Sequence, residues 1–340
     1  MLDQLGRPLR DLRISVTDRC NLRCSYCMPR EVFGAGFAFL ERRELLSFEE
    51  ITRLARSLAA MGVVKIRLTG GEPLLRRDLE RLVEMLAGVE GIADIALTTN
   101  GLLLASKARA LSDAGLKRVT VSLDALDRQT LSRMSDAPVS PERILEGIDA
   151  AANAGLHPVK VNMVVRRGLN DHRVASMAER FRHSGHVLRF IEYMDVGSSN
   201  GWRVQDVVPA GEIIAVIEER WPLQELAPMG EGEVASRYRY RDGAGEIGLI
   251  RSISKPFCGG CTRLRLSADG KLYTCLFATE GRDVRALLRG GAGEAELDRR
   301  LQELWSARAD RYSAERGEAP LRLDADASRM AKIEMSYIGG

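Results

Sequence analysis

The sequence predicts an α/β protein built on a parallel sheet, in either a doubly wound or a barrel-like arrangement. Short β-rich runs alternate with amphipathic helical stretches from Leu12 to about Tyr193. Glycines such as Gly62 and Gly115 lie where helices should stop before a strand. This alternation ends after Asn200, so we expect a second, smaller C-terminal domain.

Six β-rich runs predict the strands Leu12–Val16, Val63–Leu68, Ile95–Thr99, Val119–Leu123, Val159–Val164 and Val187–Ile191. Helices are predicted between them, among them Phe48–Met61, Asp78–Leu86 and Ser140–Ala154. Ser47, three residues before Glu50, forms a capping-box signature at the first of these helices. Six successive β/α units require right-handed crossovers onto one parallel sheet.

A domain boundary is predicted near Pro222, dividing the chain into residues 1–222 and 223–340. The alternation around Tyr238 and Tyr240 predicts strands of a hairpin. The other C-terminal expectations are a helix over Pro209–Trp221, a helical stretch over Asp283–Trp305 and a polar surface loop over Asp310–Ala327.

The composition is that of an ordinary globular protein, with 45% hydrophobic and 29% charged residues among 340. A net charge of +3 does not call for nucleic acid or an anionic membrane as partner. Met1–Arg13 lacks an apolar signal core and no run of about 18 apolar residues occurs, so a cytoplasmic location is expected. In a reducing compartment, the six cysteines are expected to bind metal and not to form disulfides.

Cys20, Cys24 and Cys27 form a C-x₃-C-x₂-C motif directly after the first predicted strand. Three thiolates on one loop can hold three irons of a [4Fe–4S] cluster and leave the fourth iron open to a small molecule. Zinc is the alternative, but a closed zinc site takes four ligands and the nearest histidine is His157. Tyr26 can either pack in the core or cover a bound cofactor.

Polar residues follow the next predicted strands, where active sites of barrel-like folds lie. The second strand leads into Thr69-Gly-Gly-Glu72, whose glycines allow close approach and whose carboxylate can accept from an ammonium group. The third and fourth strands end in Thr98-Thr-Asn-Gly and Ser122-Leu-Asp. Each of these segments alone is also an ordinary turn or helix cap.

Cationic residues occur within otherwise apolar strands, where a charge is unfavourable unless it meets a partner. Salt bridges are one explanation for each of them. Convergence of five cations from four strands is better explained by a polyanion such as a triphosphate. The five are Arg13, Lys65, Arg67, Lys160 and Arg189.

A second cysteine group, C-x₂-C-x₁₃-C, comprises Cys258, Cys261 and Cys275. A zinc ribbon would need a fourth ligand, so a second open-iron [4Fe–4S] cluster fits this spacing better. Arg263 and Arg265 alternate on a short strand between these cysteines. The chain ends in Gly339-Gly340, and the apolar Tyr337 and Ile338 before them indicate a tail that docks.

The first cysteine motif resembles the signature of the radical S-adenosylmethionine (SAM) superfamily. Together with TGGEP, TTNG, VSLDA, the second motif with its RLR and the final Gly-Gly, the chain is similar to the GTP 3′,8-cyclase family of molybdenum-cofactor biosynthesis. The resemblance implies an incomplete (βα)₆ TIM-like barrel with a smaller C-terminal domain that carries a second cluster. It also implies a lyase in which a 5′-deoxyadenosyl radical removes H3′ of GTP, giving (8S)-3′,8-cyclo-7,8-dihydro-GTP.

The same resemblance implies roles for individual residues. Cys20, Cys24 and Cys27 would bind the SAM cluster, and Cys258, Cys261 and Cys275 the auxiliary cluster. The SAM site would be lined by Tyr26, Gly71, Glu72, Ser122 and Met194. The substrate would contact Arg13, Lys65, Arg67, Thr98, Lys160, Arg189, Arg263 and Arg265. A catalytic role is implied for Arg13, Arg263, Arg265, Gly339 and Gly340.

The implied partners are GTP as substrate, a low-potential electron donor of the flavodoxin or ferredoxin type, and the next enzyme of the pathway, cyclic pyranopterin monophosphate synthase. A homodimer is neither indicated nor excluded. Two rival functions are a peptide-modifying radical SAM enzyme with auxiliary clusters and a non-enzymatic metal-binding module. The peptide-modifying enzymes usually carry more C-terminal cysteines and no Gly-Gly end.

Overall fold

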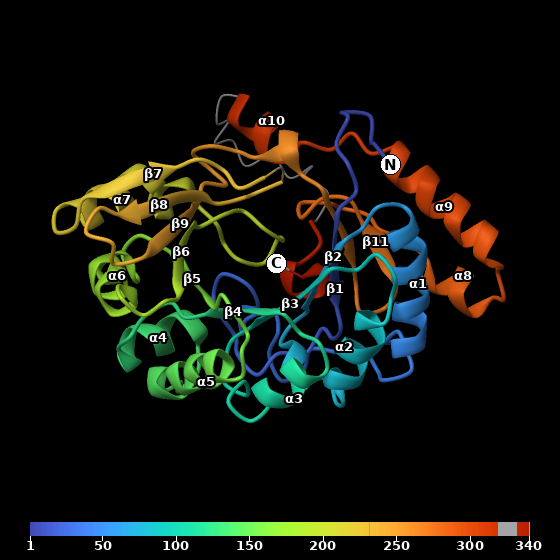
Figure 1. The fold of residues 1–340 in the computed structure, drawn as a ribbon, viewed down its shortest axis with the longest axis horizontal. Helices are drawn as coiled ribbons and strands as arrows, with labels where there is room; N and C mark the ends of the chain where they lie inside the picture. The colour runs from blue at the N-terminus through green and yellow to red at the C-terminus, as the bar shows by residue number, and fades with distance from the viewer. Residues whose placement is uncertain (231, 319–331, 340) are drawn as a thin grey trace.

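The computed structural model describes residues 1–230, 232–318 and 332–339, and its strands form one sheet of 12 (Figure 1). Six of them pair in parallel, each with the next along the chain. They are β1 (Asp11–Ser15), β2 (Lys65–Thr69), β3 (Asp94–Thr99), β4 (Arg118–Ser122), β5 (Lys160–Val165) and β6 (Val187–Glu192). The parallel sheet expected from the sequence is confirmed.

Helices connect these strands and cover the outer side of the sheet (Figure 1). The capping box at the first of them is confirmed, since Ser47 Oγ accepts from Glu50 N at 3.1 Å and Glu50 Oε2 accepts from Ser47 N at 2.6 Å. The helices are α1 (Phe48–Ala60), α2 (Leu79–Ala87), α3 (Ala108–Asp113), α4 (Arg128–Ser135), α5 (Pro141–Asn153), α6 (Val174–Phe181) and α7 (Ala210–Glu218).

The C-terminal part of the chain extends the same sheet at both edges. β9 (Glu246–Ile250) lies parallel to β6, and the antiparallel strands β8 (Ser236–Tyr240) and β7 (Leu223–Leu226) follow it, which confirms the predicted hairpin. At the other edge β10 (Arg263–Leu266) lies parallel to β1 and is followed by β11 (Lys271–Tyr273) and β12 (Arg282–Asp283). The segment after residue 222 therefore flanks the six-stranded core on two sides.

The prediction of a surface loop over Asp310–Ala327 is wrong for residues 312–318, which form the helix α10 (Tyr312–Glu318). The aromatic ring of Tyr312 stacks on Phe277 at 4.6 Å, and this contact holds the short helix against the protein. The stretch Asp283–Trp305 is helical as expected but divides at Gly290 and Gly291 into α8 (Arg285–Arg289) and α9 (Glu294–Ser306). Residues 319–331 lie outside the described residues.

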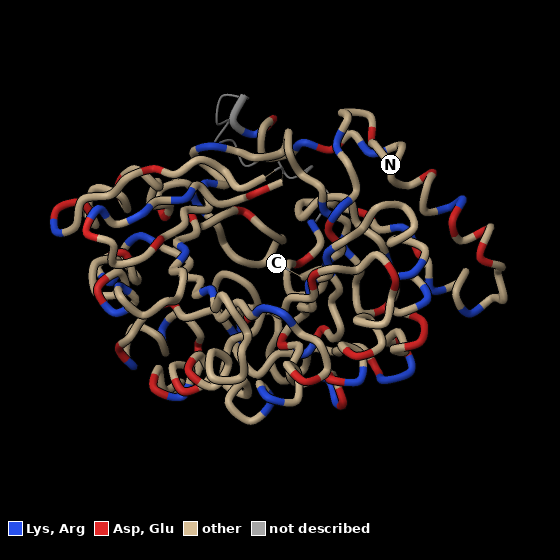
Figure 2. The backbone as a smooth tube through the Cα atoms, viewed as in Figure 1, with Lys and Arg blue, Asp and Glu red and all other residues tan. Residues whose placement is uncertain are grey.

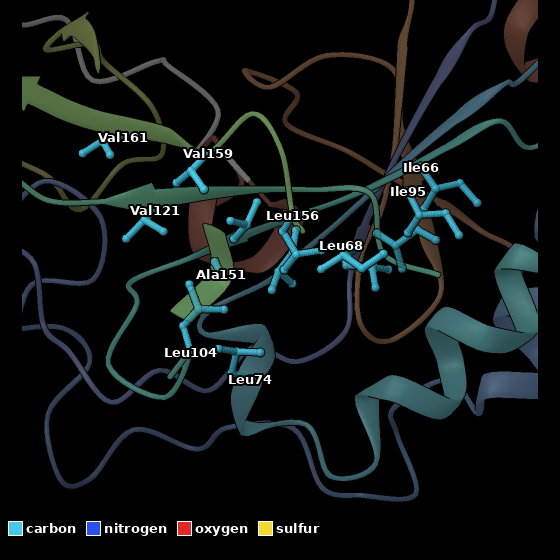
Figure 3. Packing of buried hydrophobic residues seen from close by; sticks show 14 of the residues in the cluster. Ile66, Leu68, Leu74, Ile95, Leu104, Val121, Ala151, Leu156, Val159 and Val161 are labelled. Atoms are coloured by element: carbon cyan, nitrogen blue, oxygen red, sulfur yellow. The ribbon is translucent and has the colours of Figure 1, made fainter. Parts of the chain in front are cut away.

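Alternation along the strands separates an apolar layer from an interior layer. Leu12, Ile66 and Val161 point toward the helices and are fully buried, and Figure 3 shows Ile66 and Val161 among the residues of this layer. Arg13 and Arg67 occupy the alternate positions of β1 and β2, and they are neighbours in the register of these two parallel strands. Figure 2 shows charged residues of both signs along the outer helices, for example on α9. No helix in the described ranges is long and apolar enough to cross a membrane.

The last described residues lie on the inner side of the sheet, where a short helix α11 (Met335–Ile338) contacts β1 (Figure 1). Ile338 is fully buried, and Ile333 N donates to Ala278 O at 3.0 Å. The predicted docking of the tail is therefore confirmed for residues 332–339.

Candidate active site

The first cysteine group lies on the loop that leaves β1, at the carboxyl edge of the sheet. Cys20, Cys24 and Cys27 are free and half-buried. Burial raises the pKa of Cys20 to about 11, and burial together with the charges of neighbouring thiols raises the pKa of Cys24 and of Cys27 well above the usual range. Such thiols ionise readily only when a metal accepts them, because the metal replaces the proton.

The two glycines after β2 allow this loop to pack closely. Gly71 N donates to Thr17 O at 2.8 Å, and a Cβ at Gly71 would lie 2.3 Å from Arg19 O. Gly70 has a φ of +142°, and a Cβ there would lie 2.4 Å from Thr17 O. The glycine pair therefore fixes the turn directly beneath the backbone that leads to Cys20.

Glu72, which follows these glycines, is a buried acceptor. One carboxylate oxygen accepts from Leu74 N at 3.0 Å and from Thr99 Oγ1 at 2.7 Å, and the other accepts from Asn100 N at 2.8 Å. Burial raises the pKa of Glu72 to about 7, against the opposing effect of these hydrogen bonds. A cation placed beside Glu72 would favour its ionised form.

Tyr26 links the first cysteine loop to the exit of β4. Its hydroxyl donates to Asp124 Oδ2 at 2.8 Å, and Asp124 Oδ1 accepts from Val164 N at 2.9 Å. Burial raises the pKa of Asp124 to about 6. Tyr26 packs with Met134 and Tyr193 beside the cysteines. Asp124 belongs to the strand exit Ser122-Leu-Asp124 that the sequence pointed to, but no role was predicted for it.

The interior face of the sheet carries a group of cations, as the strand pattern predicted. Arg67 Nη1 donates to the hydroxyls of Thr98 and Thr120, at 3.1 and 3.2 Å, and Arg189 Nε donates to Asn162 Oδ1 at 2.9 Å. Lys65 differs from the other interior cations because it is paired with carboxylates: its Nζ lies 3.6 Å from Asp11 Oδ1 and 3.9 Å from Asp94 Oδ2. Within residues 1–230, 232–318 and 332–339, no carboxylate forms a salt bridge with Arg13, Arg67, Lys160, Arg189, Arg263 or Arg265.

The charged form of these cations is destabilised, because most of them are half-buried and they repel each other. Burial and the charges of Arg189 and Arg118 lower the pKa of Lys160 to about 7. Burial and the charge of Arg67 lower the pKa of Arg189 to about 9. For Arg13, burial and the charge of Arg265 lower the pKa well below the usual value. An anion bound among them would relieve both effects.

The second cysteine group lies beside β10 and next to this cationic interior. Cys258, Cys261 and Cys275 are free and half-buried. Burial raises the pKa of Cys275 to about 11, whereas the charges of Arg263 and Arg308 outweigh burial and lower the pKa of Cys261 to about 6. Cys261 is thus prepared to act as a thiolate ligand.

The tail reaches the same interior. Gly339 O accepts from Arg265 Nη1, and Gly339 has a φ of +73°. A Cβ at Gly339 would lie 2.1 Å from Thr69 Cγ2, so only glycine fits between β2 and β10 at this point. Gly340 lies outside the described residues.

Other predicted site residues lie at the same edge of the sheet. Ser122 ends β4 opposite Asn162, and Met194 follows β6, where its carbonyl accepts from Asn200 Nδ2 at 3.2 Å. Arg308 and Glu334, which contact Cys261 and the loop after β6, were missed by sequence reasoning. Neither belongs to a motif, and only the folded chain brings them to the site.

The arrangement of the cysteines indicates the kind of metal that they fit. Among the described residues, no three His, Cys, Asp or Glu side chains converge as they would on a single metal ion. A cube-shaped cluster holds its cysteines on separate irons, so it needs thiols that are grouped but spread. Backbone N–H groups also point at sulfur, with Leu22 N at 3.4 Å from Cys20 Sγ and Phe277 N at 3.5 Å from Cys275 Sγ. Both groups fit a cluster.

A parallel α/β sheet whose first strand leads into three grouped cysteines defines the class of radical SAM enzymes. Residues 14–181 match the family model of the Radical SAM superfamily, and residues 186–314 match that of Molybdenum Cofactor Synthesis C. The solved structure of SuiB from Streptococcus suis bound to its precursor peptide SuiA has a TM-score of 0.61, covering 93% of this chain and 68% of that chain. At 15% identity this likeness shows the fold alone.

Curated relatives identify the family within this class. The chain is 58% identical to the GTP 3′,8-cyclase of Acidothermus cellulolyticus, covering 99% of this chain and 98% of that one. It is 50% identical to the GTP 3′,8-cyclase of Staphylococcus aureus strain JH9 and 48% identical to that of Staphylococcus carnosus, each with the same coverage. The chain belongs to the GTP 3′,8-cyclase family.

Proposed function

We propose that the chain is a lyase that converts GTP to (8S)-3′,8-cyclo-7,8-dihydro-GTP, the first step of molybdenum-cofactor biosynthesis. The observation that carries the proposal is the group of half-buried interior cations that form no salt bridge with a carboxylate among residues 1–230, 232–318 and 332–339. A triphosphate supplies the negative charge that this interior lacks. Membership of the GTP 3′,8-cyclase family supports the same substrate.

Cys20, Cys24 and Cys27 would hold a [4Fe–4S] cluster whose open iron binds the amino and carboxylate groups of SAM. When bound, this cluster supplies the electron for reductive cleavage of SAM. The chain's own residues position the cofactor: Glu72 would accept from its ammonium group, and Gly71 keeps the backbone free of side chain there. Tyr26, Ser122 and Met194 would line the remaining walls.

Cys258, Cys261 and Cys275 would hold a second cluster, whose open iron would bind the guanine of GTP. The phosphates would then extend along the interior strands. In this arrangement Lys160, Arg189 and Arg67 are the phosphate contacts, with Thr98 beside Arg67. Lys65 would contribute more weakly because Asp11 and Asp94 already neutralise it.

Arg13, Arg263 and Arg265 form a separate group on β1 and β10, next to the tail. The register places Arg13 opposite Arg265, and Gly339 O accepts from Arg265. These arginines and the Gly339-Gly340 end would orient the ribose and exclude water from the radical step. Their charges would also disfavour premature release of the anionic substrate.

The partners follow from the chemistry. A low-potential flavodoxin or ferredoxin would reduce the first cluster, and cyclic pyranopterin monophosphate synthase would consume the product. Six free thiols are compatible with a reducing, cytoplasmic location. A homodimer would leave the proposed site unchanged, since its residues all belong to one chain.

The test is anaerobic. The clusters are reconstituted, SAM, dithionite and GTP are added, and 5′-deoxyadenosine and cyclised GTP are followed. Both products should form with GTP, and ATP should give no cyclised product. If 5′-deoxyadenosine forms and GTP is untouched, the substrate assignment is wrong.

A Cys275→Ala variant isolates the second cluster. It should still cleave SAM reductively, because the first cysteine group is intact, yet make little cyclised product. Full cyclisation by this variant would contradict the role of Cys258, Cys261 and Cys275.

A further inference from the structure

Arg308 is a buried arginine at the end of α9 that contacts the second cysteine group through both of its terminal nitrogens. Its Nη2 lies 3.1 Å from Cys261 Sγ, and its Nη1 donates to Cys261 O at 2.7 Å. Arg263, the first residue of β10, contacts the same sulfur. Its Nε lies 3.4 Å and its Nη2 3.3 Å from Cys261 Sγ. One thiol therefore receives two guanidinium groups.

The position of Arg308 is set by a buried ionic network. Asp310 Oδ2 lies 3.0 Å from Arg308 Nε, and Asp3 Oδ2 lies 3.4 Å from Arg308 Nη1. Asp3 also pairs with Arg7 at 2.6 Å, and Arg7 Nη1 donates to Cys258 O at 3.1 Å. The guanidinium carbon Cζ of Arg308 lies over the Trp305 ring, 4.6 Å from its centroid. Two carboxylates and a ring thus fix a guanidinium that points at sulfur.

The first cysteine group has no equivalent. Arg23 is on the same loop, but it donates to the carbonyls of Cys20, Leu22 and Phe33. Leu22 N, at 3.4 Å, is the donor to Cys20 Sγ. Over the described ranges no guanidinium or ammonium donates to a sulfur of Cys20, Cys24 or Cys27.

We propose that Arg308 is a positioning residue that makes the cluster bound by Cys258, Cys261 and Cys275 easier to reduce than the cluster bound by the first cysteine group. Hydrogen bonds to cluster sulfurs and local charge both set the reduction potential of an iron–sulfur cluster. A cationic donor stabilises the more negative, reduced form more than the oxidised form. The inference rests on the proposed second cluster.

The test is a potentiometric titration of the reconstituted full chain, followed by electron paramagnetic resonance. The signal of the second cluster is assigned by its loss in Cys275→Ala. In Arg308→Gln, which removes the charge, the midpoint potential of that signal should become more negative by at least a tenfold change in the reduction equilibrium, about 59 mV for one electron. The signal of the first cluster should not move.

Arg182→Gln is the matched control, because Arg182 is also a largely buried arginine that pairs with an aspartate, Asp242, and lies over an aromatic ring, Trp221. It makes no hydrogen bond to a cysteine. Its loss should leave both potentials unchanged. An equal shift in Arg182→Gln and Arg308→Gln would show a general loss of packing and would overturn the inference.

Iron content separates the possible failures. A wild-type chain that binds about four irons and not about eight has no second cluster, and then the proposed function fails first. If Arg308→Gln keeps both clusters with unchanged potentials, the tuning role is wrong. If Arg308→Gln loses the second cluster, the same titration is made on Arg308→Lys, which keeps the charge but not the fork of donors. One ammonium cannot hold both the carbonyl and the sulfur of Cys261 as the two nitrogens of Arg308 do, so the potential should become more negative, though by less than about 59 mV. An unchanged potential would contradict the part of the inference that rests on the hydrogen bond to sulfur.

Discussion

At the scale of single residues, Lys160 gives the site a dependence on pH. Its pKa of about 7 is low because of burial first and then the surrounding cations. A triphosphate would raise this pKa, so above about pH 7 binding must take up a proton that the free site lacks. We predict that GTP affinity falls as the pH rises above about 7.

Calorimetry at about pH 8 in buffers of different ionisation enthalpy measures this proton. Wild type should take up a large part of one proton on binding GTP, and Lys160→Gln should take up much less and bind more weakly. Lys117→Gln, which removes an exposed lysine just before β4, is the control and should behave as wild type. Equal uptake by Lys160→Gln would mean that another group titrates.

Gly71 is the residue at which backbone packing controls the first cluster. Gly71→Ala would place a Cβ 2.3 Å from Arg19 O, and this backbone atom can move only if the cysteine loop moves. We predict that the variant retains less than half of the iron of the first cluster after reconstitution. Gly211→Ala, in a helix with open space around the Cβ, should bind iron normally and gain about 0.5–1 kcal/mol of stability.

At the scale of elements, Glu334 fixes the tail to the loop after β6. Its Oε1 accepts from Ser198 N at 3.0 Å and from Ser199 N at 3.1 Å, and its Oε2 accepts from Ser199 Oγ at 2.8 Å. Hydrogen bonds to a charged group contribute about 1.5–3 kcal/mol each. We predict that Glu334→Ala increases amide hydrogen exchange in residues 335–339 at least about tenfold, because 1.4 kcal/mol is a factor of ten.

Mass spectrometry of exchanged peptides gives this measurement, with Glu303→Ala as control. Glu303 is an exposed carboxylate on α9 that pairs with Arg299, so its loss should leave exchange in the tail unchanged. If exchange in the tail is equal in wild type and Glu334→Ala, burial of Ile338 alone holds the tail.

The elements that sequence predicted well are those with a local signal. Period-two and helical patterns gave β1 to β6 and α1 within two residues of their bounds, and the cysteine spacing located both groups. α10 was missed because its stability comes from Tyr312 stacking on Phe277, a contact between residues far apart in sequence. Arg308 was missed for the same reason: its carboxylate Asp3 and its thiol Cys261 are distant along the chain.

At the scale of the whole molecule, the predicted boundary near residue 222 does not interrupt the sheet. β9 and β10 belong to the C-terminal segment, yet they pair with β6 and β1 of the first segment. The apolar core likewise includes Leu12 together with Leu264 and Trp305. Glu192, at the end of β6, accepts from Ala210 N at 2.8 Å and Ile253 N at 2.8 Å, which joins the two segments again.

This continuity predicts that residues 1–222 do not fold stably alone. Removal of residues 223–340 would leave one edge of β1 and one edge of β6 without a neighbouring strand, and such exposed sheet edges aggregate. The truncated chain should therefore be largely insoluble when expressed, while a chain lacking only residues 336–340 should stay soluble with a single calorimetric transition. A soluble 1–222 fragment with the circular dichroism of a folded α/β protein would show instead that the six-stranded unit is an independent domain and that the C-terminal strands merely dock on it.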